Sequence, residues 1–386
     1  MEISVIHWIC ITFIVFVLAL EKRLLLQRRA AIPIRIHVHG TRGKSTTVRY
    51  LYDELRARGF RVLAKTTGDQ PEYNLPDGNT EPIRRFSPAR ITEHIRIFNK
   101  AAQLGVNALV VEGMALQRET VWFSQQILCP THVVITNVRP DHAESMGEGF
   151  AGVASTLALA AAPGRPLYIG EESGAEILRK LASQSGEAAA DVRLVPSRHF
   201  LDQARDLAQR VAEDISPCNK QAGLRHKEEK PLATSGRLEI ATITFEENPP
   251  LLFVDLFSAN DVVSVQKLNA ELGLDGPDAF NIVLLATRAD RPLRTKSFLT
   301  WLAEQKFDLV IAMGSHAPFA LLYGSRLQLP IHPMWPFMAP PKVLERLCRI
   351  ARERPDRPTR LIGLGNAHGF GEQWRSFCHQ AGEAKC

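Results

Sequence analysis

Residues 34–46 read Ile-Arg-Ile-His-Val-His-Gly-Thr-Arg-Gly-Lys-Ser-Thr. The run Ile34–His39 predicts a buried strand, and Gly40–Thr46 predicts a glycine-rich turn that opens a helix at Lys44. In such a turn the backbone N–H groups and the helix N-terminus bind phosphate, the lysine adds positive charge, and the hydroxyl of Ser45 can bind Mg²⁺. The standard eight-residue phosphate loop would require glycine at Val38, so this turn is a shorter variant.

The composition is that of a globular protein that handles anions. The 386 residues suffice for two or three domains, and the hydrophobic (45%) and charged (23%) contents are ordinary. A net charge of +6 suits a phosphate-binding enzyme or a protein beside an anionic membrane. No dense basic run alternates with aromatic residues, so we expect no nucleic acid partner. The six cysteines are scattered without a Cys-x-x-Cys, which argues against a zinc site or redox pair and favours reduced thiols.

The N-terminal segment differs from the rest of the chain because Val5–Leu20 is almost wholly apolar. Glu2 is the only charged residue before this run, and Lys22, Arg23, Arg28 and Arg29 follow it. A secretory signal peptide would carry its positive charge before the apolar run. Residues 1–30 therefore predict an uncleaved single-pass membrane anchor with a basic flank, and the positive-inside rule puts the catalytic body in the cytoplasm. A buried or interfacial helix is the alternative.

From Pro33 onward, short apolar strands alternate with amphipathic helices, which predicts an α/β fold with a mostly parallel sheet. A second, smaller α/β unit follows a polar stretch at 218–235, and we divide the chain at 1–30, 31–235 and 236–386. Residues 66–87 are polar and read as one long loop. The strands are predicted at 34–39, 61–65, 108–112, 132–136, 167–169, 238–245, 251–256, 282–286, 309–312 and 360–362. The clearest helices are predicted at 44–58, 89–104 and 200–214.

Polar residues follow several of these strands, where the carboxyl edge of an α/β sheet binds ligands. Glu112 ends a buried strand, and Asn137, Asp141 and His142 follow the next one. A carboxylate near Ser45 would complete part of a Mg²⁺ shell, and the Asp-His pair could bind a second metal or orient an acceptor. A solvated strand end is the alternative for Glu112, and a structural role is the alternative for His142.

The C-terminal unit offers further candidates, each weak as a bare pattern. Arg237 could point a guanidinium at phosphates, and Asn260-Asp261 follows a strand. Arg288 and Arg291 follow another strand, and they suit carboxylate recognition by paired hydrogen bonds. His368 lies in a third glycine-rich turn between strand and helix, 363–369.

Taken together, these motifs resemble the Mur ligase superfamily of ATP-dependent amide ligases. The closer likeness is to the catalytic subunits of poly-γ-glutamate (capsule) synthetases, the CapB/PgsB type. The stretches that carry this likeness run from the N-terminus to residue 370, so it covers nearly the whole chain. They are Leu20-Glu21-Lys22-Arg23, the loop 40–46, Lys65-Thr66-Thr67-Gly68, Glu112-Gly113-Met114-Ala115, Asn137-Val138 with Asp141-His142 and Met146-Gly147, Ser258-Ala259-Asn260-Asp261, Arg288-Ala289-Asp290-Arg291 with Arg294-Thr295, and Gly365-Asn366 with His368-Gly369.

The resemblance implies a reaction and a domain plan. ATP would phosphorylate the γ-carboxylate at the end of a growing chain, and the amine of an incoming glutamate would displace phosphate. Residues 31–235 would be the ATP-binding domain of the Mur ligase fold, and 236–386 a Rossmann-like domain that closes onto substrate and ATP. ATP and Mg²⁺ are the expected cofactors. The expected partners are glutamate, the polyglutamate chain, the membrane and other membrane subunits of a capsule synthetase complex.

The resemblance also assigns roles to residues. The catalytic set is Lys44, Glu112, His142 and Arg237, and the metal ligands are Ser45, Glu112 and His142. The ATP-binding set is Gly40, Thr41, Arg42, Gly43, Lys44, Ser45, Thr46, Asn137, Asn260 and Asp261. The substrate-binding set is Arg288, Arg291 and His368.

The chain departs from the family pattern at several places. Near the start of helix 200–214 the family tends to carry an asparagine, whereas His199 and Gln203 stand here. Val262-Val263 follows Asn260-Asp261, where the family usually has small or hydroxyl residues. Residues 215–235 look unlike the family. Two other functions therefore stay open: a folylpolyglutamate-like or cell-wall ligase with a small acceptor, and a non-catalytic nucleotide-binding subunit of an export complex.

Overall fold

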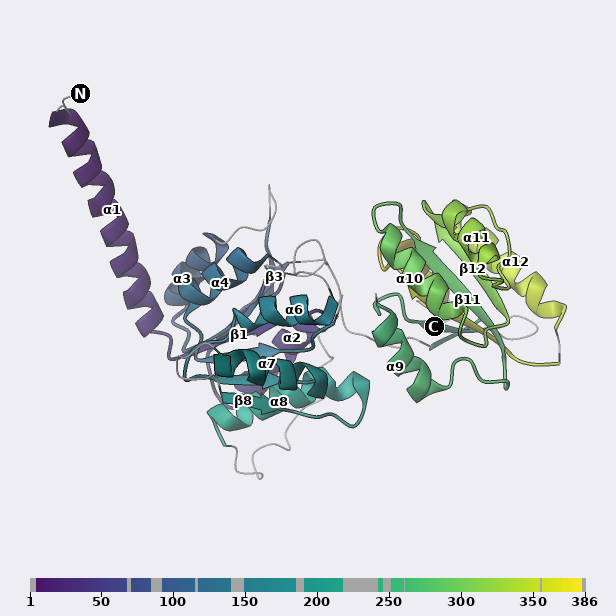
Figure 1. The fold of residues 1–386 in the computed structure, drawn as a ribbon, viewed down its shortest axis with the longest axis horizontal. Coiled ribbons are helices and arrows are strands. Elements are labelled where there is room, and N and C mark those ends of the chain that lie inside the picture. Colours follow the sequence, from purple (N-terminus) through teal and green to yellow (C-terminus); the bar gives the residue numbers. More distant parts are fainter. Residues whose placement is uncertain are drawn as a thin grey trace. The chain divides into compact units, whose positions relative to one another are not determined.

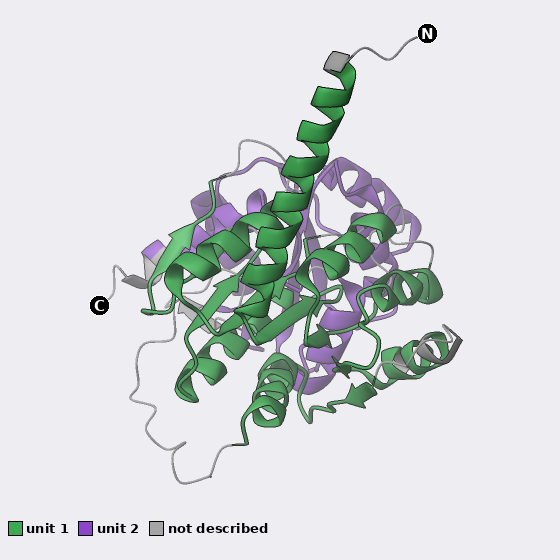
Figure 2. Ribbon diagram, turned by 90° about the vertical axis from the view of Figure 1, so that its left-hand side faces the viewer, with its two compact units in different colours: residues 1–236 green, residues 237–386 purple. Residues whose placement is uncertain are grey.

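The computed structural model describes residues 5–67, 71–84, 92–114, 117–139, 149–184, 191–217, 242–245, 251–259, 261–354 and 356–383. The chain divides into two compact units, Met1–Gly236 and Arg237–Cys386, which Figure 2 colours green and purple. Each unit is an α/β sheet with helices on both faces. We describe each one by itself.

The first unit begins with helix α1 and contains an eight-stranded sheet (Figure 1). Its helices are α1 Val5–Ala30, α2 Lys44–Ala57, α3 Thr92–Leu104, α4 Arg118–Leu128, α6 Gly149–Ala158, α7 Glu172–Gln184, the 3₁₀ turn η1 Phe200–Asp202 and α8 Gln203–Ile215. Its strands are β1 Ile34–His39, β2 Val62–Lys65, β3 Glu72–Asn74, β4 Thr80–Pro82, β5 Ala108–Glu112, β6 His132–Ile135, β7 Pro166–Ile169 and β8 Asp191–Leu194.

Strand β1 lies in the middle of this sheet, whose order is β4-β3-β2-β5-β1-β6-β7-β8. The strands from β2 to β8 in this order run parallel, and β3 and β4 are antiparallel additions at one edge. Val38 pairs with Glu112 and His39 with Ile135, so the ends of β5 and β6 lie on either side of the turn after β1. This register brings Glu112 and Asn137 to one edge of the sheet.

Successive side chains of each strand point to opposite faces of the sheet, so a hydrophobic core forms on each face. Ile36 and Val38 of β1 pack with helices α2 and α8 on one face of the sheet. On the other face, α3 and α4 cover β2 and β5, while α6 and α7 cover β6 and β7. Strands buried on both faces often read as near-continuous apolar runs, as Ala-Leu-Val-Val of β5 does, whereas β1 alternates apolar residues with arginine and histidine.

The second unit has a five-stranded sheet in the order β12-β11-β13-β10-β9. Its strands are β9 Thr242–Phe245, β10 Leu251–Asp255, β11 Phe280–Thr287, β12 Leu309–Gly314 and β13 Thr359–Gly365, of which only β9 is antiparallel to its neighbour. Its helices are α9 Val262–Leu272, α10 Pro292–Leu302, α11 Ala317–Arg326, α12 Pro340–Arg352 and α13 Phe370–Glu383. Phe253 and Trp374 lie at the centre of its core.

The predicted α/β architecture is confirmed, with two local corrections. Residues 66–87 are not one loop, because β3 and β4 extend the sheet from β2 through the pairs Lys65–Tyr73 and Tyr73–Glu81. Strand β8 was missed because its sequence, Asp-Val-Arg-Leu, is half charged. Residues 218–235, predicted as a linker, lie outside the described residues. Among the described residues, no helix combines the length and the apolarity needed to cross a membrane.

Candidate active site at the edge of the first sheet

The turn after β1 has the backbone geometry that its glycines predict. Gly40 and Gly43 have φ angles of 125° and 76°, a region that other residues rarely adopt. Gly40 also lies against the end of β6, where an added Cβ would be 2.1 Å from Oγ1 of Thr136. Gly43 ends the turn and precedes the first residue of α2, Lys44. The N–H groups of the first turn of α2 therefore face the end of β1, as phosphate binding requires.

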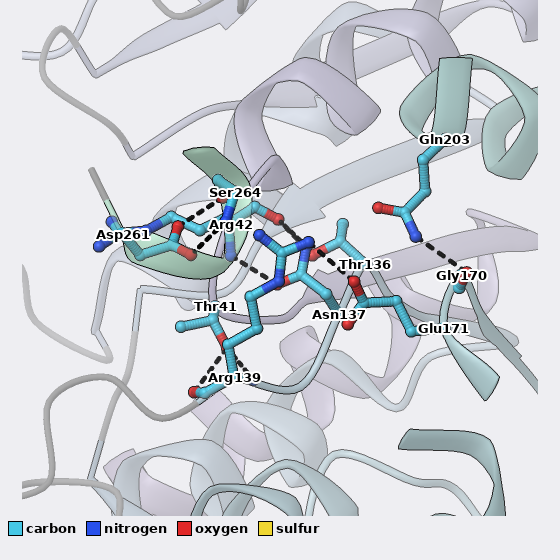
Figure 3. Close-up of polar contacts among 10 residues, drawn as sticks. All are labelled: Thr41, Arg42, Thr136, Asn137, Arg139, Gly170, Glu171, Gln203, Asp261 and Ser264. Carbon is cyan, nitrogen blue, oxygen red and sulfur yellow. Dashed lines mark hydrogen bonds and ion pairs between the residues drawn. The ribbon is translucent and has the colours of Figure 1, made fainter. Parts of the chain in front are cut away.

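The residues that follow β6 hold this turn by hydrogen bonds, as Figure 3 shows. The backbone N–H of Arg42 donates to Oδ1 of Asn137 (2.9 Å), and Nδ2 of Asn137 donates to the carbonyl of Arg42 (3.0 Å). The hydroxyl of Thr136 donates to the same carbonyl (2.5 Å). The hydroxyl of Thr41 accepts from the N–H of Arg139 (3.0 Å). Asn137, predicted to bind ATP, is 3% exposed and uses its amide on the loop backbone.

Lys44 folds back over the turn. Its Nζ donates to the carbonyl of Gly40 (2.8 Å) and to that of Thr41 (3.4 Å). The ammonium group is therefore at the mouth of the turn, where a bound phosphate would meet it. Thr46 follows in the same first turn of α2.

Ser45 and Glu112, predicted as metal ligands, are in direct contact. The hydroxyl of Ser45 donates to Oε2 of Glu112 (2.8 Å), and the N–H of Thr67 donates to the same oxygen (2.8 Å). Glu112 is 3% exposed, so its carboxylate is fixed by these donors. A hydroxyl and a carboxylate at one spot are the oxygen ligands that Mg²⁺ prefers, and they fit part of its shell. Within the described residues, no group of three or more histidine, cysteine, aspartate or glutamate side chains could hold a metal.

Three buried histidines, for which no role was predicted from the sequence, lie behind this edge. His37 and His39 of β1 share a hydrogen bond between Nδ1 and Nε2 (3.0 Å), and His94 of α3 bonds Ser124 (3.1 Å). Burial, with nearby positive charge second, lowers the pKa of His39 and that of His94 to about 3 each. The His39 ring also packs on Gly113, where an added Cβ would be 2.5 Å from its Nδ1. These neutral rings fix the end of β1 against the residue after Glu112.

A buried ion pair lies next to the histidines. Nζ of Lys65, a fully buried side chain at the end of β2, is 2.6 Å from Oε2 of Glu93 on α3. The same Nζ is 3.1 Å from Sδ of Met114. The positive charge of Lys65 contributes to the lowered pKa of His37 and of His94, after burial itself. The sequence signal available for this pair was the position of Lys65 at the end of the predicted strand 61–65.

A second buried ion pair lies beyond β6. Nη2 of Arg139 is 2.7 Å from Oε1 of Glu171, and the guanidinium is 5.1 Å from the centre of the Phe200 ring. Gln203, near the position where the family tends to carry asparagine, donates from Nε2 to the carbonyl of Gly170 (2.8 Å, Figure 3). These contacts tie the start of α8 to the end of β7.

In the second unit the predicted residues lie at strand ends or helix starts. Asp261 caps α9 by accepting from the N–H (2.8 Å) and the hydroxyl (2.5 Å) of Ser264, drawn in Figure 3. Arg288 makes a paired contact with Asp290 two residues later (2.9 and 2.7 Å). Arg291 precedes the first residue of α10, and His368 is 3.5 Å from Glu372.

Arg294 and Asn366 link two strand ends in this unit. Nη1 of Arg294 donates to Oδ1 of Asn366 (2.9 Å), whose Nδ2 donates to the carbonyl of Ala286 (3.0 Å). The predicted residues Asp141, His142, Arg237 and Asn260 lie outside the described residues. The structure thus brings together, in the first unit, the turn 40–46, Glu112 and Asn137.

Comparison with known proteins agrees with this geometry. Residues 240–381 match the family model of the poly-gamma-glutamate synthase CapB C-terminal domain. The chain is 27% identical to the capsule biosynthesis protein CapB of Bacillus anthracis, covering 94% of this chain and 80% of that protein. It is 26% identical to the PGA synthase CapB of Bacillus subtilis, covering 94% of both. The predicted resemblance to the CapB family is confirmed.

Several solved structures have a fold similar to that of this chain. Folylpolyglutamate synthase of Mycobacterium tuberculosis, complexed with ADP and AMPPCP, matches with a TM-score of 0.61 at 18% identity, over 90% of this chain and 91% of that one. A bifunctional folylpolyglutamate synthase/dihydrofolate synthase of Yersinia pestis, complexed with AMPPNP and Mn ion, matches with a TM-score of 0.57 at 15% identity, over 95% and 93%. At these identities the likeness concerns the fold alone.

Proposed function

We propose that this protein is an ATP-dependent amide ligase that elongates poly-γ-glutamate. The observation that carries the proposal is the contact between Ser45 and Glu112 beside the Lys44 turn, in a chain similar to CapB proteins over 94% of its length. A phosphate turn with a neighbouring oxygen-ligand pair is the equipment for phosphoryl transfer. The names of the relatives, capsule biosynthesis protein and PGA synthase, supply the substrate.

The reaction would proceed in two steps. An oxygen of the γ-carboxylate at the chain end attacks the γ-phosphorus of ATP, giving an acyl phosphate and ADP. The amine of an incoming glutamate then attacks the acyl carbon, phosphate leaves with the bonding electron pair, and the amine loses a proton. The two reactants are both anionic, so the protein must neutralise charge and hold them together.

The site residues of the first unit would meet these requirements. Lys44 would neutralise charge on the β- and γ-phosphates, and the N–H groups of 40–46 would bind their oxygens. Asn137 and Thr136 would keep the turn in its binding shape. Ser45 and Glu112 would hold Mg²⁺, which would withdraw charge from the transferring phosphoryl group. His142, outside the described residues, remains our proposed third ligand.

We further propose that the second unit binds substrate. Arg288, Arg291 and His368 would contact the carboxylates of glutamate or of the chain end. Asp261 and Asn260 would lie near ATP, and Arg237 would face its phosphates. Their support is the CapB C-terminal domain match over 240–381, which covers all of them except Arg237.

We propose that α1 attaches the enzyme to the membrane, in the form predicted from the sequence, with the catalytic body in the cytoplasm. Its support is the exposure of large apolar side chains along α1, such as Phe13 (66%) and Phe16 (63%). Other membrane subunits of a capsule synthetase would then be its partners. Deleting residues 1–30 should release the protein from membranes, and persistent sedimentation of the deletion variant with membranes would contradict this attachment.

One assay tests the ligase function. Protein in membranes or detergent is incubated with ATP, Mg²⁺ and labelled glutamate, with and without partner subunits, and ADP and γ-linked polymer are measured. We expect ADP release that depends on glutamate and matches the bonds formed. ADP release that no amino acid stimulates would refute a ligase. Stimulation only by a folate or a nucleotide-linked peptide would instead identify a ligase with a small acceptor.

A further inference from the structure

Helix α1 is exposed on all sides along its apolar part. Trp8, Ile9, Phe13, Ile14 and Phe16 are each more than half exposed. Figure 1 shows α1 extending away from the body of the first unit, with its last turns beside α3. A helix that is apolar all round needs an apolar surrounding, and the described residues of this unit leave these side chains exposed.

The last turns of α1 are held by the outer helices α3 and α4. Arg28 donates to Oδ1 of Asn99 on α3, and Arg29 donates to the carbonyl of Gln126 on α4 (3.3 Å). Leu25 packs into the core that these helices share with β2 and β5. The point where α1 leaves the body is therefore fixed relative to α3 and α4.

Both α3 and α4 carry exposed apolar side chains about one turn before these contacts. Ile95 is four residues before Asn99 and shares its helix face, and Trp122 is four residues before Gln126, whose carbonyl Arg29 contacts. Ile95, Trp122 and Phe123 are 40%, 45% and 48% exposed, and the rings of Trp122 and Phe123 are 4.9 Å apart. We call Ile95, Trp122 and Phe123 the α3/α4 patch.

Exposed basic residues lie on the same helices as the α3/α4 patch and on α1. Arg96 and Arg118, next to it on the same two helices, are exposed, as are Lys22 and Arg23 on α1. Glu119 and Glu21 are the exposed acidic residues on these stretches of α1, α3 and α4. Tryptophan with arginine and lysine at its rim is the composition that sits at the headgroup level of an anionic bilayer.

We propose that the α3/α4 patch is a second membrane contact that rests the first unit on an anionic lipid surface. The inference depends on the proposed attachment by α1, because α1 brings this face to the bilayer. Trp122 and Phe123 insert at headgroup depth, and Arg96 and Arg118 bind lipid phosphates. The membrane then lies on the side of the first unit where α3 and α4 cover the sheet, and α2 and α8 cover the opposite face.

Tryptophan fluorescence of the full chain in lipid vesicles tests the contact. The vesicles contain phosphatidylcholine and phosphatidylglycerol, with or without bromine on the acyl chains near the headgroup, and no other protein. Subtracting the spectrum of Trp122→Phe isolates Trp122, and subtracting that of Trp8→Phe isolates Trp8 on α1. We expect bromine to quench the Trp122 signal at least twofold. Quenching of Trp8 without Trp122 would overturn the α3/α4 contact and leave attachment by α1 intact.

Charge reversal gives a second readout with a matched control. Arg96→Glu combined with Arg118→Glu should at least halve the bromine quenching of Trp122 and leave that of Trp8 unchanged. Arg179→Glu, an exposed arginine on α7, should change neither signal. Unaltered Trp122 quenching in the double variant would refute the lipid-phosphate contact. Protection of Trp122 from iodide only in membranes that contain partner subunits would assign the patch to a protein and overturn the proposal.

Discussion

The two sheet edges that carry the predicted residues are built differently. In the first unit, Asn137 and Glu112 are almost fully buried, and their side chains bond the backbone or side chains of the phosphate turn. In the second unit, the side chains of Arg288 and His368 are 35% and 48% exposed and pair with carboxylates two and four residues away. Glu112 and Asn137 are thus held by long-range contacts, whereas Arg288 and His368 pair with residues close to them in the sequence.

This difference suits the two tasks that the edges would perform. Phosphoryl transfer needs charge and N–H groups held in place before the substrate arrives, because reorganisation during the reaction raises the barrier. Recognition of a growing, flexible polyanion can use arginines that exchange a weak local partner for a substrate carboxylate. Water screens an exposed ion pair and makes it weak, so breaking it costs little.

The largest effect is expected at the fixed edge from Lys44→Ala. Removing the ammonium leaves the β- and γ-phosphates without their positive partner, so kcat should fall by about 10³-fold or more. ADP formation with glutamate and primer measures it. Lys100→Ala, which removes an exposed ion pair with Glu81, is the control and should keep near-normal activity. Polymer synthesis by Lys44→Ala at the normal rate would refute the assignment of the turn.

Gly40→Ala tests whether the turn depends on its close contact with β6. The new Cβ would overlap Oγ1 of Thr136 at 2.1 Å, so the turn must move and phosphate binding should be lost. Unfolding in urea should show a loss of about 2–4 kcal/mol, from overpacking and a disallowed φ. Gly164 also has a positive φ (65°), but a Cβ added there would have no neighbouring heavy atom within 4 Å, so Gly164→Ala serves as the control.

Gly164→Ala is a control for a positive φ without a new contact, at a milder angle than that of Gly40 (65° against 125°). Gly164→Ala should cost about 1 kcal/mol and leave ATP turnover intact, because only the φ preference is violated there. Equal losses of stability and of turnover in the two variants would show that the contact with Thr136 has no special role.

The motif 34–57 could be predicted because its residue types determine strand, turn and helix locally. The partners of the turn could not, since they depend on the register that pairs Val38 with Glu112 and His39 with Ile135. The contact of Thr67 with Glu112 was not predicted because it is made by the backbone N–H, whose partner does not depend on the residue type. Likewise, β3 forms by pairing with β2, and β4 by pairing with β3, without an apolar pattern to predict them. The Arg288–Asp290 pair was not predicted either, although its two residues are close in the sequence.

Acid pH should weaken the first unit through its buried histidines. Burial lowers the pKa of His94 to about 3 and that of His132 to about 4, below the value of about 6.5 in the unfolded chain. The folded state therefore favours the neutral rings, so this stability is complete above pH 6.5 and is lost as the pH falls towards the folded values. Each histidine should contribute about 1.4 kcal/mol per pH unit in that window.

Hydrogen exchange at pH 7 and pH 5 would locate this loss. Amides of β1 and α3 should lose protection, and those of β11 and β13 should lose less. His94→Gln removes one titrating ring, while the glutamine amide can still bond Ser124. In this variant the loss of protection in the first unit should be smaller by the contribution of one histidine. An equal loss of protection in both units at pH 5 would contradict the assignment to buried histidines.

The smallest effect is expected at the exposed edge, where Arg288 and Asp290 hold each other. Arg288→Ala should raise the KM for glutamate or for the chain end by about 10-fold, because one charged hydrogen-bond pair is worth roughly 1.5 kcal/mol, while kcat changes little. Asp290→Asn frees the guanidinium from its local partner and should lower the same KM slightly. Opposite shifts in KM from these two variants would support an exchange between Asp290 and a substrate carboxylate. If both variants raised KM equally, the pair itself would be the binding element, and the second edge would be as fixed as the first.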